Sequence, residues 1–176
     1  MILRPLHPAQ PFYRVLTPRW AVAPKSGAGA AKKGARFNRP GLDALYLSTD
    51  LSTAAAEYQQ DDRLMPPGTL VAYQVALESI VDFSGGYDVT RWDPLWEDWN
   101  CEWRRLAFNL HIEPPSWLLG DLVIAAKAQA ILFPSTKHSG GANIVIFTQT
   151  LAAADVLEPF DPRGDLPANQ DSWPRA

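Results

Sequence analysis

Cysteine is almost missing from this chain of 176 residues, which contains only Cys101. A single cysteine excludes an internal disulfide and fits a reducing compartment. No apolar run approaches the length of a membrane span, and the first ten residues lack the basic-then-apolar pattern of a signal peptide. We therefore expect a cytoplasmic protein without a membrane partner.

Several catalytic motifs are also missing. The three histidines, His7, His111 and His138, are scattered and have no partner at metal-ligand spacing, so we predict no metal site. There is no Gly-x-Ser-x-Gly sequence, which leaves a Ser-His-Asp hydrolase weakly supported. The spacing of Ser135 and His138 is too common to indicate one.

Acidic residues are absent from residues 1–40, which carry eight Lys or Arg, whereas the remaining 136 residues carry eight basic and 19 acidic groups. This basic run has three interpretations: a solvated surface, a nucleic-acid-binding arm, or a wall beside a small anionic ligand such as a pyrophosphate. The acidic remainder, with a net charge of −11, would repel a phosphate backbone. We therefore expect no direct contact with nucleic acid.

The composition predicts one α+β domain with short elements. Apolar residues make up 47% of the chain, including seven Trp, so the chain can bury a core, and its 16 Pro favour many fixed turns. We expect the domain to cover residues 1–160 and residues 161–176, which show no periodicity, to form a C-terminal tail. The expected strands are 12–16, 42–47, 69–77, 130–133 and 143–147. Three helices are expected: one that begins near Leu51, one over residues 93–111 and one over residues 117–129.

Two segments need separate interpretation. Residues 24–36, rich in Gly, Ala and Lys, satisfy neither phosphate-binding glycine motif and are predicted to be a flexible loop. The Trp residues within 93–111 follow helical spacing and are predicted to pack in the core.

Glu57 is the most informative charged residue of the chain. The helix that starts near Leu51, after Thr49 or Asp50 as the N-cap, presents an apolar stripe of Leu, Ala and Tyr residues. At ~100° per residue, Glu57 lies about 120° from the centre of that stripe. A carboxylate on this flank can border a cleft rather than face open water.

An ordered series of short motifs resembles the RES family, which is named for Arg, Glu and Ser. The series consists of GARFNRPG at residues 34–41, LDALYLS at 42–48, STAAAEY at 52–58, LFPS at 132–135 and GGANIVIF at 140–147. The resemblance runs from Phe12 to about Phe147, and the order of the motifs is more specific than any one of them.

The resemblance implies a compact fold similar to that of ADP-ribosylating toxins, with a split β-core that opens into an NAD cleft and is flanked by helices. It also implies a type II toxin–antitoxin system in which a Xre-type antitoxin covers the active site. Members of the family consume NAD by hydrolysis or phosphorolysis, and some transfer ADP-ribose to a protein, one target being a phosphoribosyl pyrophosphate synthetase. The chain resembles this last branch most.

The resemblance places Glu57, Arg36, Tyr46 and Ser135 at the catalytic centre, and the residue types suit the chemistry. Cleavage of the nicotinamide–ribose bond develops positive charge on the ribose, which Glu57 can stabilise while it holds the ribose hydroxyls. Arg36 can grip a phosphate with two hydrogen bonds.

Further contacts with NAD are expected around this centre. Tyr46 can stack on the cationic nicotinamide ring, and Ser135 can donate a hydrogen bond to the nicotinamide amide or to a phosphate. Arg14, Ser48 and Asn143 are additional candidates for binding NAD or bracing the cleft. NAD enters as a substrate, and no metal is expected.

Two alternatives stay open from the sequence. Within enzymes, the chain could degrade NAD with water or phosphate as the acceptor and have no protein target. In a different class, residues 1–40 could form a non-catalytic nucleic-acid-binding module, which salt-sensitive binding without loss of NAD would indicate.

Overall fold

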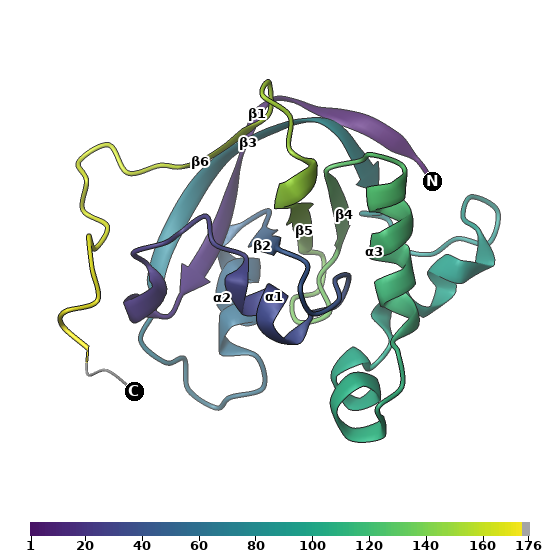
Figure 1. Ribbon diagram of the computed structural model, residues 1–176, viewed down its shortest axis with the longest axis horizontal. Coiled ribbons are helices and arrows are strands. Elements are labelled where there is room, and N and C mark those ends of the chain that lie inside the picture. The colour runs from purple at the N-terminus through teal and green to yellow at the C-terminus, as the bar shows by residue number, and fades with distance from the viewer. Residues whose placement is uncertain (174–176) are drawn as a thin grey trace.

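The computed structural model describes residues 1–173 and contains a six-stranded sheet that closes on itself. Its order is β1-β2-β5-β4-β3-β6, with a second pairing between β1 and β3. The strands are β1 (Leu3–Leu16), β2 (Ala44–Ser48), β3 (Thr69–Asp82), β4 (Ala130–Pro134), β5 (Ala142–Phe147) and β6 (Val156–Pro159). The long strands β1 and β3 arch together over the molecule, and β6 runs along β3 (Figure 1).

The sheet consists of two halves that touch at their ends. One half is β1, β3 and β6, and the other is β2, β5 and β4. The halves join through the single pair Tyr13↔Ser48 on one side and through the parallel pairs Ile80↔Ala130 to Asp82↔Leu132 on the other. This arrangement confirms the predicted α+β domain with a split β-core.

Three α-helices accompany the sheet: α1 (Ala28–Lys33), α2 (Leu51–Gln59) and α3 (Pro115–Ala125). Helix α3 stands beside β4, whereas α1 and α2 lie near β2 (Figure 1). The prediction of α2 is confirmed, and its N-cap is Asp50, whose side chain accepts a hydrogen bond from the Thr53 amide. Short 3₁₀ turns span Pro18–Trp20, Pro94–Asn100 and Thr148–Thr150.

Alternating residues of the central strands feed two hydrophobic layers. On β5, Ile144 and Ile146 point into the space enclosed by the two halves, while Val145 and Phe147 pack in the layer beneath α3. A strand with both faces buried produces a continuous apolar sequence, which is what residues 144–147 show. The two hydrophobic layers together bury both faces of the central strands.

Two strands are longer than predicted because of their partners. β1 begins at Leu3 rather than at residue 12, since it pairs with β3 along most of its length, with register shifts near its prolines. β3 continues past residue 77 to Asp82 because its last residues pair with β4.

The expected helix over residues 93–111 is wrong. The chain forms a 3₁₀ turn at Pro94–Asn100, extends at Cys101, and then forms a π-helix at Arg105–Leu110. One straight helix would bury Leu95 and Leu110 together, yet they are 50% and 48% exposed. The tryptophans instead take different directions, and this tertiary packing overrides the helical spacing.

The predicted burial of tryptophan in this region is confirmed. Trp92 and Trp96 pack on Phe83 with ring centroids 4.7 and 4.8 Å away, in the layer beneath α3. Trp103, beyond the break at Cys101, is also buried.

Residues 24–36 are not a flexible loop throughout, because residues 28–33 form α1. The helix ends at Gly34, which has a φ of 79°. The side-chain amide of Asn38 donates to the Ala30 carbonyl and the backbone amide of Gly41 donates to the Ala31 carbonyl, so the turn after α1 folds back on it. Contacts from the following turn, rather than local propensity, hold this short helix.

The last part of the chain has no helix or strand between residues 161 and 173. Leu166 packs on the core enclosed by the sheet, and the side-chain amide of Gln170 donates to the Arg19 carbonyl. The predicted tail over 161–176 stays a prediction, and its residues 174–176 lie outside the described residues. Within residues 1–173, no helix is both long and apolar enough to cross a membrane.

Candidate active site

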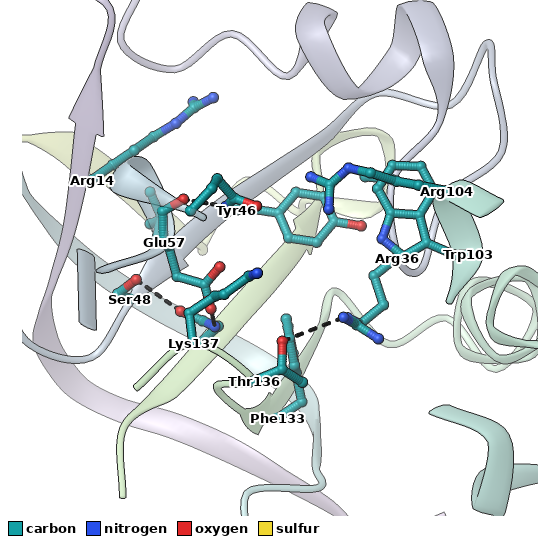
Figure 2. A pocket seen from close by; sticks show the side chains of 14 residues that line it. Arg14, Arg36, Tyr46, Ser48, Glu57, Trp103, Arg104, Phe133, Thr136 and Lys137 are labelled. Carbon is teal, nitrogen blue, oxygen red and sulfur yellow. Dashed lines mark hydrogen bonds between the residues drawn. The ribbon is translucent and has the colours of Figure 1, made fainter. Parts of the chain in front are cut away.

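A cleft of about 240 Å³ lies where β1 and β2 meet, because Arg14 of β1 and Ser48 of β2 both line it; Figure 2 shows most of its side chains. Six of the seven residues predicted for the site line it: Arg14, Arg36, Tyr46, Ser48, Glu57 and Asn143. The seventh, Ser135, is bonded to Glu57. The lining also includes residues that the sequence did not single out: Ala35, Leu47, Gln60, Trp103, Arg104, Phe133, Thr136 and Lys137.

Glu57 projects from α2 and is fixed by two donors. Its Oε1 accepts hydrogen bonds from Ser135 Oγ at 2.8 Å and from Asn143 Nδ2 at 2.6 Å. No described side chain binds Oε2. One carboxylate oxygen is therefore held by the protein, and the other can interact with a ligand.

A second layer fixes the donor from β5. Asn143 Oδ1 accepts from Ser48 Oγ at 2.7 Å, and the two residues are direct partners in the β2–β5 pairing. Ser48 and Asn143 are only 4% and 5% exposed. Their polar groups thus brace Glu57, and direct contact of either residue with NAD remains a prediction.

The hydroxyl of Ser135 is oriented by its own loop. Its Oγ accepts from the backbone amides of Lys137 at 3.1 Å and His138 at 3.0 Å. A hydroxyl has one hydrogen, which is directed here at Glu57. Ser135 therefore acts as a donor to the carboxylate of Glu57.

Arg36 lies on a turn that is fixed from two sides. From α3, Trp117 Nε1 donates to the Ala35 carbonyl at 2.7 Å, and Gly120 approaches the Phe37 carbonyl so closely that a Cβ would overlap it. From β2, the Tyr46 hydroxyl accepts from the Phe37 amide at 3.0 Å. The sequence GARFN, at residues 34–38, is thus held in place by contacts from α3 on one side and from β2 on the other.

The hydrogen-bond partners of the Arg36 guanidinium are neutral. It donates to the Trp99 carbonyl at 3.2 Å, lies 5.7 Å from the centroid of the Trp99 ring, and contacts Thr136 Oγ1 at 3.5 Å. Burial lowers the pKa of Arg36, and electrostatic interactions with Cys101, Tyr46 and Glu57, in that order, offset this lowering only in part. Arginine stays protonated in spite of such a shift, so this is a half-buried cation.

Arg14 is a second such cation, on β1. Its guanidinium donates to the Ser26 carbonyl at 3.2 Å, and burial lowers its pKa, with an opposing contribution from Tyr73. In residues 1–173 neither Arg14, Arg36 nor Arg104 forms an ion pair. Figure 2 shows Arg14 and Arg36 on different sides of the cleft.

The hydroxyl of Tyr46 is occupied by the turn that carries Arg36, which leaves only its ring for the cleft. The hydroxyl donates to Asn38 Oδ1 at 2.9 Å and accepts from the Phe37 amide, and burial raises the pKa of the phenol. The ring lines the cleft. This geometry is compatible with stacking and leaves the hydroxyl occupied in the turn that carries Arg36.

Arg104 and Lys137 add positive charge that sequence reasoning missed. Arg104 stacks on Trp103 at 4.7 Å, and its charge contributes to lowering the pKa of Arg36. Lys137 pairs with Asp61 at 2.6 Å, but Asp61 is 90% exposed. Among the described residues that line the cleft, Glu57 is the only carboxylate beside four cationic side chains.

The basic residues of the segment 1–40 lie in two kinds of place: some form part of the cleft wall, and others lie at the protein surface. Arg14 and Arg36 form part of the cleft wall. Arg4, Lys25 and Arg39 instead pair with surface or half-buried carboxylates. Within residues 1–173, no three His, Cys, Asp or Glu side chains gather as the ligands of a metal would.

A match to the RES domain covers residues 11–169 of the chain. The chain belongs to the RES domain family. The motifs that resembled the family, from the Arg36 turn to the Ser135 loop, all lie at or beside the cleft of this RES domain.

The fold also resembles that of a known structure. A chain from the crystal structure of the M. tuberculosis MbcT–MbcA toxin–antitoxin complex superposes with a TM-score of 0.57 at 15% sequence identity. The match covers 88% of this chain and 84% of that one. At this identity the likeness concerns the fold. No curated protein matches the chain significantly in sequence.

Proposed function

We propose that this RES domain is the toxin of a type II toxin–antitoxin system, and that it cleaves NAD at the nicotinamide–ribose bond and transfers the ADP-ribose to a protein. The observation that carries the proposal is the single fixed carboxylate of Glu57, which shares its cleft with four cationic side chains. The family membership supports NAD as the substrate.

Cleavage of NAD requires stabilisation of a cation more than proton transfer. The bond between the pyridinium nitrogen and C1′ breaks with its electron pair going to nitrogen, so nicotinamide leaves as a neutral molecule. Positive charge then develops on the ribose, as in glycoside hydrolysis. A carboxylate beside that centre interacts most strongly in the transition state, which is the condition for raising kcat.

Glu57 meets this requirement through its oxygens. Oε1 is held by Ser135 and Asn143, so the carboxylate does not need to reorganise when the charge develops. Oε2 is then available for the ribose hydroxyls and the developing positive centre. Glu57 is the catalytic residue in this proposal, and the other two set its position.

The cations of the cleft suit the pyrophosphate of NAD. Arg36 is pre-organised by Trp99 and Thr136, so a phosphate meets a guanidinium whose orientation is already fixed. Arg104 lies near enough to Arg36 to affect its pKa, and together they offer two planar donors to one anionic group. The ring of Tyr46 remains for the nicotinamide.

The acceptor of the ADP-ribose is the finer part of the proposal. Resemblance to the protein-modifying branch of the family favours a protein acceptor, such as a phosphoribosyl pyrophosphate synthetase, whose nucleophile loses a proton as it bonds to C1′. One observation favours a second candidate: Arg14 is a further cleft cation without an ion pair in residues 1–173. A second anion site would suit phosphate as the acceptor, and the product would be ADP-ribose 1″-phosphate.

A toxin of this kind needs an inhibitor in the cell that makes it. We propose a Xre-type antitoxin that covers the cleft, and we place both proteins in the cytoplasm, where NAD is available. The structural neighbour is described as part of a toxin–antitoxin complex, which supports a partner of this class.

Two measurements test the proposal. Purified protein is incubated with NAD, and the products are identified by mass spectrometry; free nicotinamide is expected, and its absence would contradict NAD cleavage. Lysate supplied with labelled NAD is then expected to show one or a few labelled proteins. Label found only in ADP-ribose or its 1″-phosphate would replace protein transfer by NAD degradation.

A further inference from the structure

The loop that carries Ser135 contacts α2 at a second point, one helical turn from Glu57. Thr53 and Glu57 are four residues apart and thus lie on the same face of α2. Glu57 contacts Ser135, and Thr53 contacts His138, three residues further along the same loop. The loop is therefore attached to one helix face by two adjacent hydrogen bonds.

The hydrogen bond between Thr53 and His138 has a direction that can be derived. Thr53 Oγ1 lies 2.6 Å from Asp50 Oδ2 and 2.8 Å from His138 Nδ1. The hydrogen bonds from Thr53 hold the pKa of Asp50 below its usual range, so Asp50 is a carboxylate that can only accept. The one hydroxyl hydrogen of Thr53 thus goes to Asp50, and His138 Nδ1 must carry the hydrogen that Thr53 accepts.

The surroundings leave little freedom at this contact. Thr53 is fully buried, and a Cβ at Gly141 would overlap its hydroxyl. The loop closes on itself, because the Gly141 amide donates to the His138 carbonyl and the Ser135 amide donates to the Gly141 carbonyl. A displacement of His138 would therefore move the whole loop, including the hydroxyl of Ser135.

We infer that His138 is a positioning residue: it donates from Nδ1 to Thr53, which Asp50 orients, and this bond holds the Ser135 loop in register with Glu57. Asp50 thereby has two functions. It is the N-cap of α2, and it is the acceptor that fixes the direction of the hydrogen bond between His138 and Thr53. His138 also supports Ser135 directly, through its backbone amide. The kinetic part of this inference rests on the proposed function, but the contact itself does not.

The tautomer of His138 is the first test, and it needs no activity. Neutral imidazole in water favours the hydrogen on Nε2, so a histidine fixed as Nδ1–H is distinguishable by its ¹⁵N chemical shifts. We expect Nδ1–H for His138 at about pH 8.5, where an ordinary imidazole is neutral, with the exposed His111 as an internal reference. The Thr53→Val variant should return His138 to Nε2–H. An Nε2–H tautomer in the native protein would overturn the inference.

The second test separates positioning from binding. His138→Leu removes the donor, whereas His138→Asn places an amide donor near the position of Nδ1. Because small displacements of a catalytic group cost roughly 10- to 100-fold in rate, we expect kcat for NAD cleavage to fall by about that factor in the Leu variant, with KM little changed. The Asn variant should recover most of the loss.

Native kcat in a folded His138→Leu protein would overturn the positioning role, as would a loss confined to KM. If the native protein shows the Nδ1–H tautomer but no cleavage of NAD, the hydrogen bond from His138 to Thr53 is confirmed and the proposed function fails. Should the Leu variant fail to fold, kcat of the Thr53→Val variant decides, since it removes the acceptor and keeps the shape of the side chain.

Discussion

Ser135 Oγ lies 2.8 Å from Glu57 Oε1, although the two residues are 78 positions apart in the chain. The β4–β5 turn and the N-terminal cap of α2 bring them together, and Asn143 Nδ2 meets the same oxygen at 2.6 Å. Two donors on one oxygen leave the carboxylate with a single fixed orientation. This orientation is the basis for the first prediction.

Removal of one donor to Glu57 should lower kcat, and removal of both should cost more than the sum. A hydrogen bond to a charged group contributes about 1.5–3 kcal/mol, so Ser135→Ala and Asn143→Ala should each lower kcat by roughly 10- to 100-fold. In each single variant the remaining donor still orients the carboxylate, so the double variant should fall further than additivity predicts. Strict additivity in the measured kcat values would show that the two donors do not act on one orientation.

Arg36→Lys tests whether Arg36 binds phosphate. The variant keeps the positive charge but loses the planar pair of donors, so the Kd for NAD should rise by about tenfold, a loss of ~1.4 kcal/mol. The melting temperature should stay within the error of the native value. Arg63→Lys, at an exposed position, is the control and should bind NAD as the native protein does. An unchanged Kd for Arg36→Lys in calorimetry would remove Arg36 from the binding site.

Tyr46 should contribute to stability and to binding through different atoms. Tyr46→Phe leaves the ring in place but deprives the Phe37 amide and Asn38 Oδ1 of their partner, so the free energy of unfolding should fall by about 1–3 kcal/mol. The Kd for NAD should change little in this variant and rise clearly in Tyr46→Leu, which lacks the ring. Equal Kd values for the two variants would argue against stacking.

Gly120 should be intolerant of any side chain. A Cβ there would overlap the Phe37 carbonyl, so Gly120→Ala should push α3 away from the turn that carries Arg36 and cost on the order of 1–3 kcal/mol in unfolding. Gly29→Ala is the matched control, because its Cβ would enter open space in α1, where alanine favours the helix by about 1 kcal/mol. Equal stabilities of the two variants in denaturant would refute the close approach.

Much of the site could be predicted because its residues lie in short, ordered motifs. Helix α2 was predictable from its N-cap and its apolar stripe, and the flank position of Glu57 pointed to a cleft border. The roles within the site were harder to predict. That Ser48 and Asn143 brace Glu57 depends on the register of β2 and β5, which pairs them directly.

The missed parts of the site depend on tertiary packing. Trp103 and Arg104 reach the cleft because the chain breaks at Cys101, where helical spacing predicted continuity. Asp50 and Thr53 lie within one turn of each other at the start of α2, but His138, which Thr53 contacts, is 85 residues away in the chain. No local pattern specifies such a meeting, whereas the folded chain does.

The most direct test of the whole account is NAD cleavage by Glu57→Gln. Glutamine keeps the shape and polarity of the side chain but removes the charge that faces the developing cation. Nicotinamide release, followed by mass spectrometry, should fall by roughly two to four orders of magnitude, about 3–5 kcal/mol in the barrier, while the exposed control Glu78→Gln keeps native turnover. A folded Glu57→Gln protein that releases nicotinamide at the native rate would contradict the assignment of the cleft as the active site.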